Sequence, residues 1–403
     1  MDQDWKATDK LTRHINYWLN RVDATKEADL YFFNQPVDEL KGNARAIVRG
    51  REMMMFASYS YLGLLGHPRI NEAAKEAIDK YGTGTHGVRP LAGTLCLHEE
   101  LEETIARFKQ VEAAVTFSSG YVTNLTAVST LVGRHDTVIC DKLNHASIVD
   151  GCLLSGAKFV RFKHNDMQDL ERALRSADSS GVKLVVVDAV FSMDGDVIDL
   201  PHVAELCRKY RAWLMVDEAH SVGVLGETGR GIEEHFEMGN VVDIKMGTLS
   251  KTIPSVGGYL AGREDLIQMF KHASRAFIFS AALSPAQAAA AKAAFEVILD
   301  EPERVAALSR NAAHFTQGLK QIGFDTMNTT TAIVPVLCGE DERAYLMVQR
   351  CQRHDVFVLP VVSPAVPRGL ARLRSTVTAG HSAQDIERAL DIFETAGRQA
   401  GII

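Results

Sequence analysis

The stretch KLVVVDAVFSMDGDVIDLPHVAELCRKYRAWLMVDEAH, residues 183–220, decides the fold class. It holds two short apolar runs rich in β-formers, KLVVVDAVF (183–191) and WLMVDEA (213–219). Between them, LPHVAELCRKY (200–210) repeats apolar residues three and four positions apart, which is the pattern of an amphipathic helix. Strand, helix and strand in this order predict two parallel strands joined by a crossover helix.

The same alternation continues on both sides of this stretch. Further helix-like segments are TNLTAVSTLV (123–132) and MQDLERALRSA (167–177). Because each apolar run is short and bounded by turn residues, the segments predict a doubly wound α/β domain with a mostly parallel sheet. The other expected strands are AAVTF (113–117), TVIC (137–140), KFVRF (158–162) and DIKMGT (243–248).

The pattern changes at both ends of the chain. Scattered aromatic residues among charges, from Trp5 to Phe33, predict an N-terminal arm of helical segments that pack on another part of the protein. After Pro285 we expect one long Ala-rich helix to about Leu319, and then strands and helices that no longer alternate one for one. The expected parts are an arm that begins the small domain (1–57), a large α/β domain (58–285) and a small α+β domain (286–403).

Composition and charge exclude several classes of protein. The chain has 403 residues, of which 46% are hydrophobic and 24% charged, and this composition excludes a disordered protein. A net charge of -7 without a run of Lys or Arg argues against a nucleic-acid partner. The start MDQDWKATDK lacks the features of a secretory signal, and no apolar run is long enough to cross a bilayer. We therefore expect a cytoplasmic protein.

Several motifs suggest other sites but fail on their context. GTGTHG (82–87) has the letters of a dinucleotide loop, yet it follows the helical segment INEAAKEAIDKY instead of a strand. DEAH (217–220) would need the phosphate loop of a helicase, and the chain has no Gly-Lys dipeptide. Six cysteines without a C-x-x-C pair, and the lack of an H-E-x-x-H motif, predict reduced thiols and no metal site.

Polar side chains follow most of the expected strands. Ligands of open α/β sheets bind beyond the carboxyl ends of the strands. Singly, a strand-end Asp is commonly a turn former, and a lone Lys or His is more often on the surface or structural than catalytic. Together they form a constellation that consists of Ser118 to Tyr121 after AAVTF, His145 after TVICDKLN, Ser192 after VVVDAVF, Asp217 and His220 after WLMV, and Thr248 to Lys251 after DIKMG.

The constellation has the parts that a pyridine aldehyde phosphate needs. Ser119, Gly120 and Tyr121 open a helix, where free N–H groups and the helix dipole favour a phosphate. The other parts are a carboxylate, an amine and two imidazoles at neighbouring strand ends, namely Asp217, Lys251, His145 and His220.

Six segments between residues 144 and 374 carry a resemblance to a known family, and the resemblance runs from about Tyr59 to His381. In order and spacing they resemble the α-oxoamine synthase family of fold-type I enzymes, which use pyridoxal 5'-phosphate (PLP). The resemblance implies a homodimer with shared active sites. The segments are NHASIVDG (144–151), FSMDGD (191–196), DEAHSVGVLGETGRG (217–231), DIKMGTLSK (243–251), GGYLAG (257–262) and ARLR (371–374).

The resemblance implies a role for each residue near the PLP ring. Lys251 matches the lysine that holds PLP as a Schiff base and later serves as the base at the amino acid's Cα. Asp217 would keep the pyridine nitrogen protonated. His145 would stack on the ring, and Ser192 and His220 would hydrogen-bond the ring hydroxylate.

The resemblance also implies the groups that hold the phosphate and the substrate. Arg374 matches the arginine that grips the substrate carboxylate, although strand alternation puts Arg372 on the same face. Val88 lies where family members contact the substrate side chain. Ser60 lies in a turn that is usually Asn-rich in the family, so a polar contact to the substrate carboxylate would be altered. The implied phosphate ligands are Ser119, Gly120, Tyr121 and Thr248, with Ser280 of the partner subunit.

The implied reaction is the condensation of an amino acid with an acyl thioester of coenzyme A or an acyl carrier protein. Loss of carbon dioxide would usually follow and give an α-aminoketone. The alternatives are another fold-type I enzyme, such as an aminotransferase or a decarboxylase, and a non-catalytic partner subunit, against which Lys251 argues. The chain departs from the family pattern at Ser58-Tyr59-Ser60 and in the lysine loop, which contains Pro254. Both departures bear on the choice of substrates.

Overall fold

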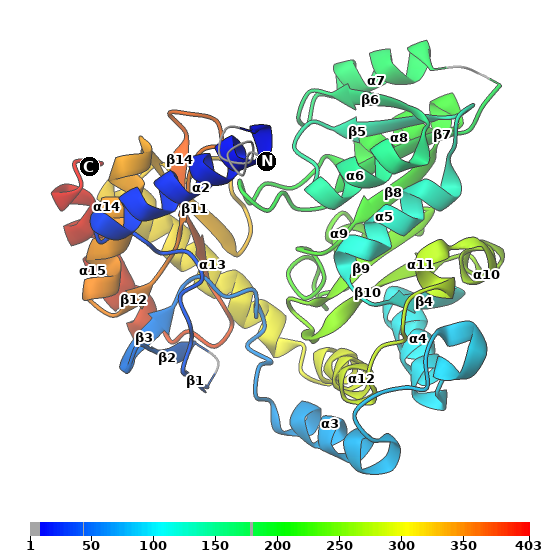
Figure 1. The fold of residues 1–403 in the computed structure, drawn as a ribbon, viewed down its shortest axis with the longest axis horizontal. Helices are drawn as coiled ribbons and strands as arrows, with labels where there is room; N and C mark the ends of the chain where they lie inside the picture. The colour runs from blue at the N-terminus through cyan, green and yellow to red at the C-terminus, as the bar shows by residue number, and fades with distance from the viewer. Residues whose placement is uncertain (1–8, 43, 178–179) are drawn as a thin grey trace, which may run out of the picture.

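The chain forms two lobes in this computed structural model, which describes residues 9–42, 44–177 and 180–403 (Figure 1). The larger lobe contains a sheet of seven strands, and the smaller lobe contains sheets of four and three strands. Trp5, which belongs to the expected arm, lies outside the described residues.

The large sheet is doubly wound and mostly parallel, which confirms the expected fold class. Strand β10 runs antiparallel to both of its neighbours, and the other six strands point the same way. The strands follow each other across the sheet as β4 (Ala113–Phe117), β10 (Pro254–Gly262), β9 (Ile244–Ser250), β8 (Trp213–Asp217), β7 (Lys183–Asp188), β5 (Thr137–Asp141) and β6 (Lys158–Phe162).

Strand β10 was not among the expected strands because glycines interrupt its sequence PSVGGYLAG. The structure explains Gly258 by close packing. A Cβ atom added there would lie 2.8 Å from Gly120 Cα, at the start of helix α5 (Gly120–Leu131). The glycine therefore lets the first turn of α5 lie directly on the sheet.

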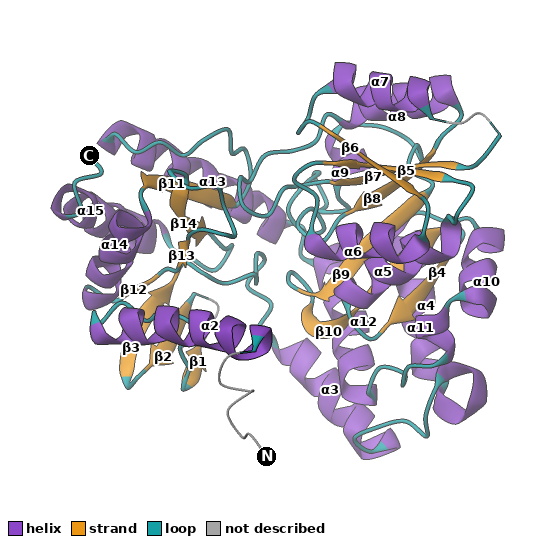
Figure 2. Cartoon of the chain, turned by 45° about the horizontal axis from the view of Figure 1, so that its top comes forward, coloured by secondary structure: helices purple, strands orange, loops and turns teal. Residues whose placement is uncertain are grey.

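Helices cover both faces of the large sheet (Figure 2). Alternate residues of β7 show this: Leu184 and Val186 join the hydrophobic core beneath α5 and α6, whereas Val185 and Val187 join the core beneath α7 and α8. Helix α3 ends at Tyr81, so GTGTHG does follow a helix, as expected. The remaining elements of this lobe are α3 (Pro68–Tyr81), the π-helix η1 (Arg89–Gly93), α4 (Cys96–Lys109), α6 (Ala146–Ser155), α7 (Met167–Ser176), α8 (Leu200–Tyr210), α9 (Ile232–His235), α10 (Glu264–Ala273), α11 (Arg275–Ile278) and α12 (Pro285–Asp300).

The small lobe combines both ends of the chain. Its sheets are β1 (Glu39–Lys41), β2 (Arg45–Val48), β3 (Arg51–Met55) and β12 (Val356–Phe357), and then β11 (Ile333–Gly339), β14 (Ala371–Thr376) and β13 (Pro360–Val361). Its helices are α2 (Lys10–Glu27), α13 (Glu303–Ile322), α14 (Asp341–Arg353) and α15 (Ala383–Gln399).

A shared core joins the two ends. Strand β3 pairs in parallel with β12, so that Met54 lies opposite Val356. Phe56 is fully buried, and its ring centroid lies 5.1 Å from that of Phe315 and 6.4 Å from that of Phe393. The domain limits at residues 57 and 285 stay a prediction. Helix α12, which begins at Pro285, packs mainly on α3 and α4 of the large lobe.

The expectation of one long Ala-rich helix after Pro285 was wrong, because the segment forms two helices, α12 and α13. The chain leaves the helical conformation at Glu301, with φ -124° and ψ 58°, directly before Pro302. Proline disfavours the helical conformation in the residue before it and cannot donate an N–H to the preceding turn. The break turns the chain from the large lobe into the small one.

All six cysteines are free, and five are buried while Cys96 is exposed. No helix in the described ranges is long and apolar enough to cross a membrane. Across the same residues, no group of three or more His, Cys, Asp and Glu side chains is arranged to hold a metal ion.

Candidate active site

A cavity of about 240 Å³ lies at the carboxyl ends of the parallel strands. Its wall combines the ends of β7, β8 and β9 with the first turns of α5 and α6. Most of the predicted site residues line this cavity, namely Ser119, Gly120, Tyr121, His145, Ser192, Asp217, His220, Thr248 and Lys251.

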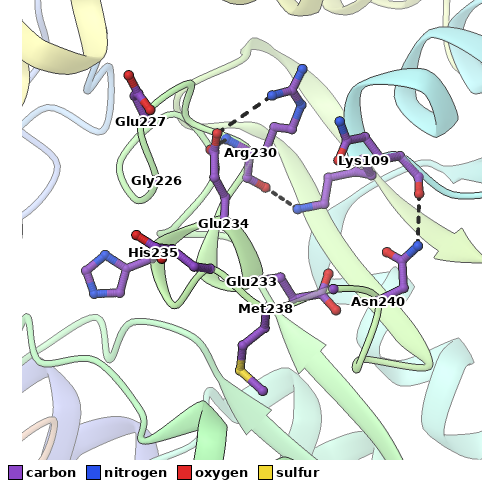
Figure 3. Close-up of a pocket in the computed structure, with 12 residues that line it drawn as sticks. Lys109, Gly226, Glu227, Arg230, Glu233, Glu234, His235, Met238 and Asn240 are labelled. Carbon is purple, nitrogen blue, oxygen red and sulfur yellow. Dashed lines mark hydrogen bonds and ion pairs between the residues drawn. The ribbon is translucent and has the colours of Figure 1, made fainter.

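A larger cavity, of about 770 Å³, lies on the large lobe near α9 (Figure 3). Several of its charged side chains are bonded to neighbouring groups. Glu234 accepts a hydrogen bond from the backbone N–H of Arg230, and Glu233 accepts two from backbone N–H groups. Lys109 forms a buried ion pair with Glu218 at 2.5 Å. These groups stabilise the loop before α9, so the smaller cavity is the candidate site.

Asp217 is a buried carboxylate at the end of β8, with 5% of its surface exposed. Its Oδ2 accepts a hydrogen bond from Asn124 Nδ2 at 2.6 Å, and its Oδ1 accepts one from the Ala219 N–H at 2.8 Å. Asn124 Nδ2 also donates to Ser147 Oγ at 2.9 Å. Since Asn124 belongs to α5 and Ser147 to α6, these bonds connect the carboxylate with both helices.

His145 caps helix α6 beside this carboxylate. Its Nδ1 lies 2.7 Å from Ser147 Oγ, and its backbone N–H donates to Asp188 Oδ2 at 2.9 Å. Burial lowers the pKa of His145, the Asp217 carboxylate opposes that change, and Lys251 adds to it. The imidazole is therefore mostly neutral at pH 7.

The first turn of α5 forms a second wall of the cavity. Ser119 caps the helix, and its Oγ accepts from the Val122 N–H at 3.2 Å. Gly120 packs so closely that an added Cβ atom would lie 2.8 Å from Thr248 Oγ1. Thr248 Oγ1 lies 2.9 Å from Ser250 Oγ. Hydroxyl groups and helix N–H groups thus converge where a phosphate binds well.

Lys251 enters the cavity without a charged partner. Among the described residues it forms no ion pair, and its Nζ lies 5.7 Å from the ring centroid of Tyr59. Burial lowers the pKa of Lys251, the Asp217 carboxylate opposes this effect, and the Arg374 guanidinium adds to it. A larger fraction of this amine is neutral than of an exposed lysine.

Arg374 and Arg372 both reach from β14 to the loop of residues 191–196, but their partners differ. Arg372 forms a buried ion pair with Asp194. Arg374 Nε donates to the Ser192 carbonyl at 2.6 Å, and its Nη1 donates to Thr376 Oγ1 at 3.0 Å. Within the described chain Arg374 has no carboxylate partner, although only 7% of its surface is exposed. The ion pair between the lobes belongs to Arg372, and Arg374 is the cation left for another anion.

Four predicted residues do not line the cavity, and Arg374, described above, is one of them. Ser280 lines a separate small cavity together with Arg89. Val88 forms an isolated bridge with Ala281, next to Ser280 in the chain. Ser60 is buried, and its Oγ has no hydrogen-bond partner. The predicted roles of these four residues remain predictions.

Comparison with known proteins decides the family. Residues 51–393 match the family model of aminotransferase class I and II. The chain is 46% identical to 8-amino-7-oxononanoate synthase of Geobacter sulfurreducens, over 98% of this chain and 100% of that protein. It is 40% identical to serine palmitoyltransferase of Sphingobacterium spiritivorum, over 98% of each chain. The chain belongs to the α-oxoamine synthase group of this family.

A solved structure agrees with this assignment. Serine palmitoyltransferase with its PLP internal aldimine matches 98% of this chain and 100% of its own, with a TM-score of 0.95 and 34% sequence identity. The protein is a PLP-dependent enzyme that condenses an amino acid with an acyl thioester. The resemblance drawn from the sequence is thereby confirmed.

The residues of the α-oxoamine synthase cavity fit PLP. An unpaired amine, a buried carboxylate and a helix N-terminus are the groups that its aldehyde, ring nitrogen and phosphate require. Gly120 supports the fit, because any larger residue would clash with Thr248 at the edge where the phosphate would bind. Two buried oxygens, Asn124 Oδ1 and Asp188 Oδ1, have no partner in the described chain.

Sequence reasoning missed several residues of this α-oxoamine synthase site. Asp188 ends β7 as Asp217 ends β8, so the strand-end rule could have found it. Asn124 stands inside the apolar segment TNLTAVSTLV, where a buried amide needs a partner. No local pattern marks Tyr59 and Tyr61, because they reach the site only where the two lobes meet.

His164 fixes the loop that carries Ser192. Its Nε2 lies 2.8 Å from Asp196 Oδ2, in that loop, and its Nδ1 lies 3.1 Å from Asp141 Oδ1, at the end of β5. Burial by itself would lower the pKa of His164, but the hydrogen bonds to Asp141 and Asp196 outweigh burial and raise the pKa to about 10. A charged imidazolium thus joins two carboxylates at neutral pH.

We predict that His164→Gln lowers the melting temperature of the PLP-bound enzyme in a pH-dependent way. A folded-state pKa of about 10, against 6.5 in the unfolded chain, means that the contribution is complete below pH 6.5 and is lost as the pH rises through about 10. The difference between wild type and variant in calorimetry should therefore shrink as the pH rises.

The matched control is His202→Gln, because His202 pairs with Asp199 but is largely exposed. This exposed pair should contribute little at any pH. A difference between wild type and His164→Gln that stays constant up to pH 10 would contradict the role of the charge.

Proposed function

We propose that Lys251 binds PLP and later moves the proton of the amino acid's Cα. When bound, PLP supplies an aldehyde that takes up amines and a ring that accepts electrons from Cα. The observation that carries the proposal is the unpaired amine of Lys251 in the same cavity as the buried Asp217. Since burial lowers the pKa of Lys251, a larger fraction of this amine is neutral and able to accept a proton than of an exposed lysine.

Asp217 would hold the proton on the ring nitrogen of PLP. Two hydrogen bonds, from Asn124 and from the Ala219 N–H, fix the carboxylate without a cationic partner. A buried carboxylate of this kind stabilises a positive charge placed beside it. The other residues would contact the rest of PLP: His145 its ring face, Ser192 and His220 its ring hydroxylate, and Ser119, Gly120, Tyr121, Thr248 and Ser280 of the partner subunit its phosphate.

Arg374 would bind the carboxylate of the amino acid. Its Nε and Nη1 are held by the Ser192 carbonyl and Thr376, and no carboxylate of the described chain neutralises it. An arginine fork binds carboxylates with two parallel hydrogen bonds, which also orients the substrate. Val88 and Ser60 stay proposed as further contacts to the substrate.

The site favours an acyl group with an apolar chain over one that ends in a charged group. The two relatives differ here, because one name denotes a product that ends in a carboxylate and the other a palmitoyl group. A cavity of about 340 Å³ adjoins the site at Ser192, and its two cations, His164 and Arg372, are already paired with aspartates. The apolar part of its wall consists of Leu143, Phe191, Met193, Met327, Ala365, Val366, Pro367 and Leu370.

The remaining features of the proposal come from the family resemblance. They are coenzyme A or an acyl carrier protein as the carrier of the thioester, a homodimer with shared sites, and a cytoplasmic location. Ser280 lines a small cavity separate from the site of its own chain, so the proposed phosphate contact needs Ser280 of the partner subunit.

The acyl preference can be measured as thiol release that depends on both substrates. We expect kcat/KM for a long-chain monocarboxylic thioester to exceed that for a dicarboxylic thioester of similar length by at least about tenfold, because an unpaired buried carboxylate is costly. Release without an amino acid serves as the blank. A preference for the dicarboxylic thioester would refute the apolar assignment.

Lys251→Ala should abolish turnover while the protein stays folded and binds PLP weakly through the phosphate groups. Borohydride should attach PLP irreversibly to the wild type and to Lys142→Ala, whose lysine is exposed, but not to Lys251→Ala. Mass spectrometry of the reduced proteins gives the result. Equal labelling of Lys251→Ala would mean that another lysine binds PLP.

Arg374→Ala should weaken binding of the amino acid by roughly 2–5 kcal/mol, as expected when one partner of a buried charged pair is lost. Arg374→Lys should restore little, since a lysine lacks the fork. The measurement is a titration of PLP absorbance with the amino acid and with the matching amine that lacks a carboxylate. The amine should bind nearly as well as to wild type, and equal losses for both ligands would indicate a structural role.

A further inference from the structure

Tyr61 lies between His220 of the large lobe and Arg374 of the small lobe. Its side chain is fully buried, and its Oη lies 2.6 Å from His220 Nδ1. Arg374 Nη2 lies 3.5 Å from the same oxygen. The backbone carbonyl of Tyr61 accepts from the Ala379 N–H at 2.7 Å, so the residue is fixed to the small lobe as well.

The direction of these hydrogen bonds follows from the chemistry of the groups. A guanidinium only donates, so Tyr61 Oη accepts from Arg374. The single phenol proton is then free to point at His220 Nδ1, which lies at a short hydrogen-bond distance. If Tyr61 donates, Nδ1 must accept and carries no proton.

The protonation states of both groups agree with this direction. Burial raises the pKa of Tyr61 to about 12, although the Arg374 charge opposes the rise, so the phenol keeps its proton. Burial lowers the pKa of His220 well below its ordinary value, and the positive charges of Lys251 and Arg374 lower it further. A neutral imidazole has one proton, and a proton absent from Nδ1 must lie on Nε2.

We propose that Tyr61 is a positioning residue that places the single proton of His220 on Nε2 by donating its own phenol proton to Nδ1. His220 lines the PLP cavity, and in the described chain Tyr61 is the only hydrogen-bond partner of its ring. The ring therefore offers the cavity an N–H donor, which is what an anionic oxygen such as the ring hydroxylate of PLP requires. The inference deepens the proposed role of His220 and rests on it.

Arg374 is part of this arrangement because it orients the phenol. Its other two bonds, to the Ser192 carbonyl and Thr376 Oγ1, keep it in place whether or not the Tyr61 hydroxyl is present. The ring of Tyr61 belongs to the main hydrophobic core of the large lobe. Tyr61→Phe therefore removes the hydroxyl and keeps the packing, so that the hydrogen bond can be tested separately from stability.

The first experiment reads the tautomer directly, in the protein freed of PLP. With ¹⁵N-labelled histidine, NMR of the wild type should show His220 with an unprotonated Nδ1 and a protonated Nε2, and His220→Asn identifies the signals. In Tyr61→Phe the Nδ1-protonated tautomer should become populated. A wild-type ring protonated at Nδ1, or a tautomer unchanged by Tyr61→Phe, would overturn the proposal.

The matched control is Thr376→Val, which removes another hydrogen bond of Arg374 without touching His220. It should leave the His220 tautomer as in the wild type. If Thr376→Val shifts the tautomer as much as Tyr61→Phe does, the effect comes from displacement of Arg374, and the direct role of Tyr61 is wrong.

A double-mutant cycle tests the consequence for PLP. Tyr61→Phe should weaken PLP binding about tenfold, the effect of one mispaired buried donor. In the His220→Asn background the same change should have less than about a twofold effect, because Tyr61 acts through His220. Additive losses would show that Tyr61 acts on its own. The NMR result does not depend on turnover, so it stands even if the proposed reaction roles fail.

Discussion

The hydrogen bond from Asn124 to Asp217 connects the sheet with the helices that form the site. A buried carboxylate without partners is costly, and here Asn124 and one backbone N–H satisfy it. The same Asn124 amide reaches Ser147, which in turn contacts the His145 ring. The bonds that satisfy this carboxylate therefore also connect it with α5, which carries the proposed phosphate-binding turn, and with α6.

The two lobes share the site through a short loop. Residues 191–196 receive Arg372 and Arg374 from the small lobe, and His164 ties the same loop to the end of β5. Arg372 forms an ion pair with Asp194 and binds the lobes together. Arg374 has no carboxylate partner in the described chain. A site divided in this way is complete only when both lobes are in contact.

Much of the fold and site could be predicted from local patterns, and what failed depended on contacts between distant segments. Asp217, Lys251 and Ser119 follow strands, so the rule for open sheets located them. Strand β10 escaped because its glycines serve close packing, which leaves no apolar alternation to detect. Tyr61 was missed because its proposed role depends on His220 and Arg374, which lie beside it only when the two lobes are assembled. The one long helix was misjudged because alanine content outweighed the signal of Pro302.

The parallel pairing of β3 with β12 has a consequence for the order of folding during synthesis. The ribosome releases β3 long before its partner β12. Phe56 can be packed in its core only after Phe315 and Phe393 have been synthesised. The large sheet has no such delay, since all its strands lie between residues 113 and 262. The large sheet can therefore form while the N-terminal hairpin of β2 and β3 still lacks its partner strand β12 and is exposed to aggregation.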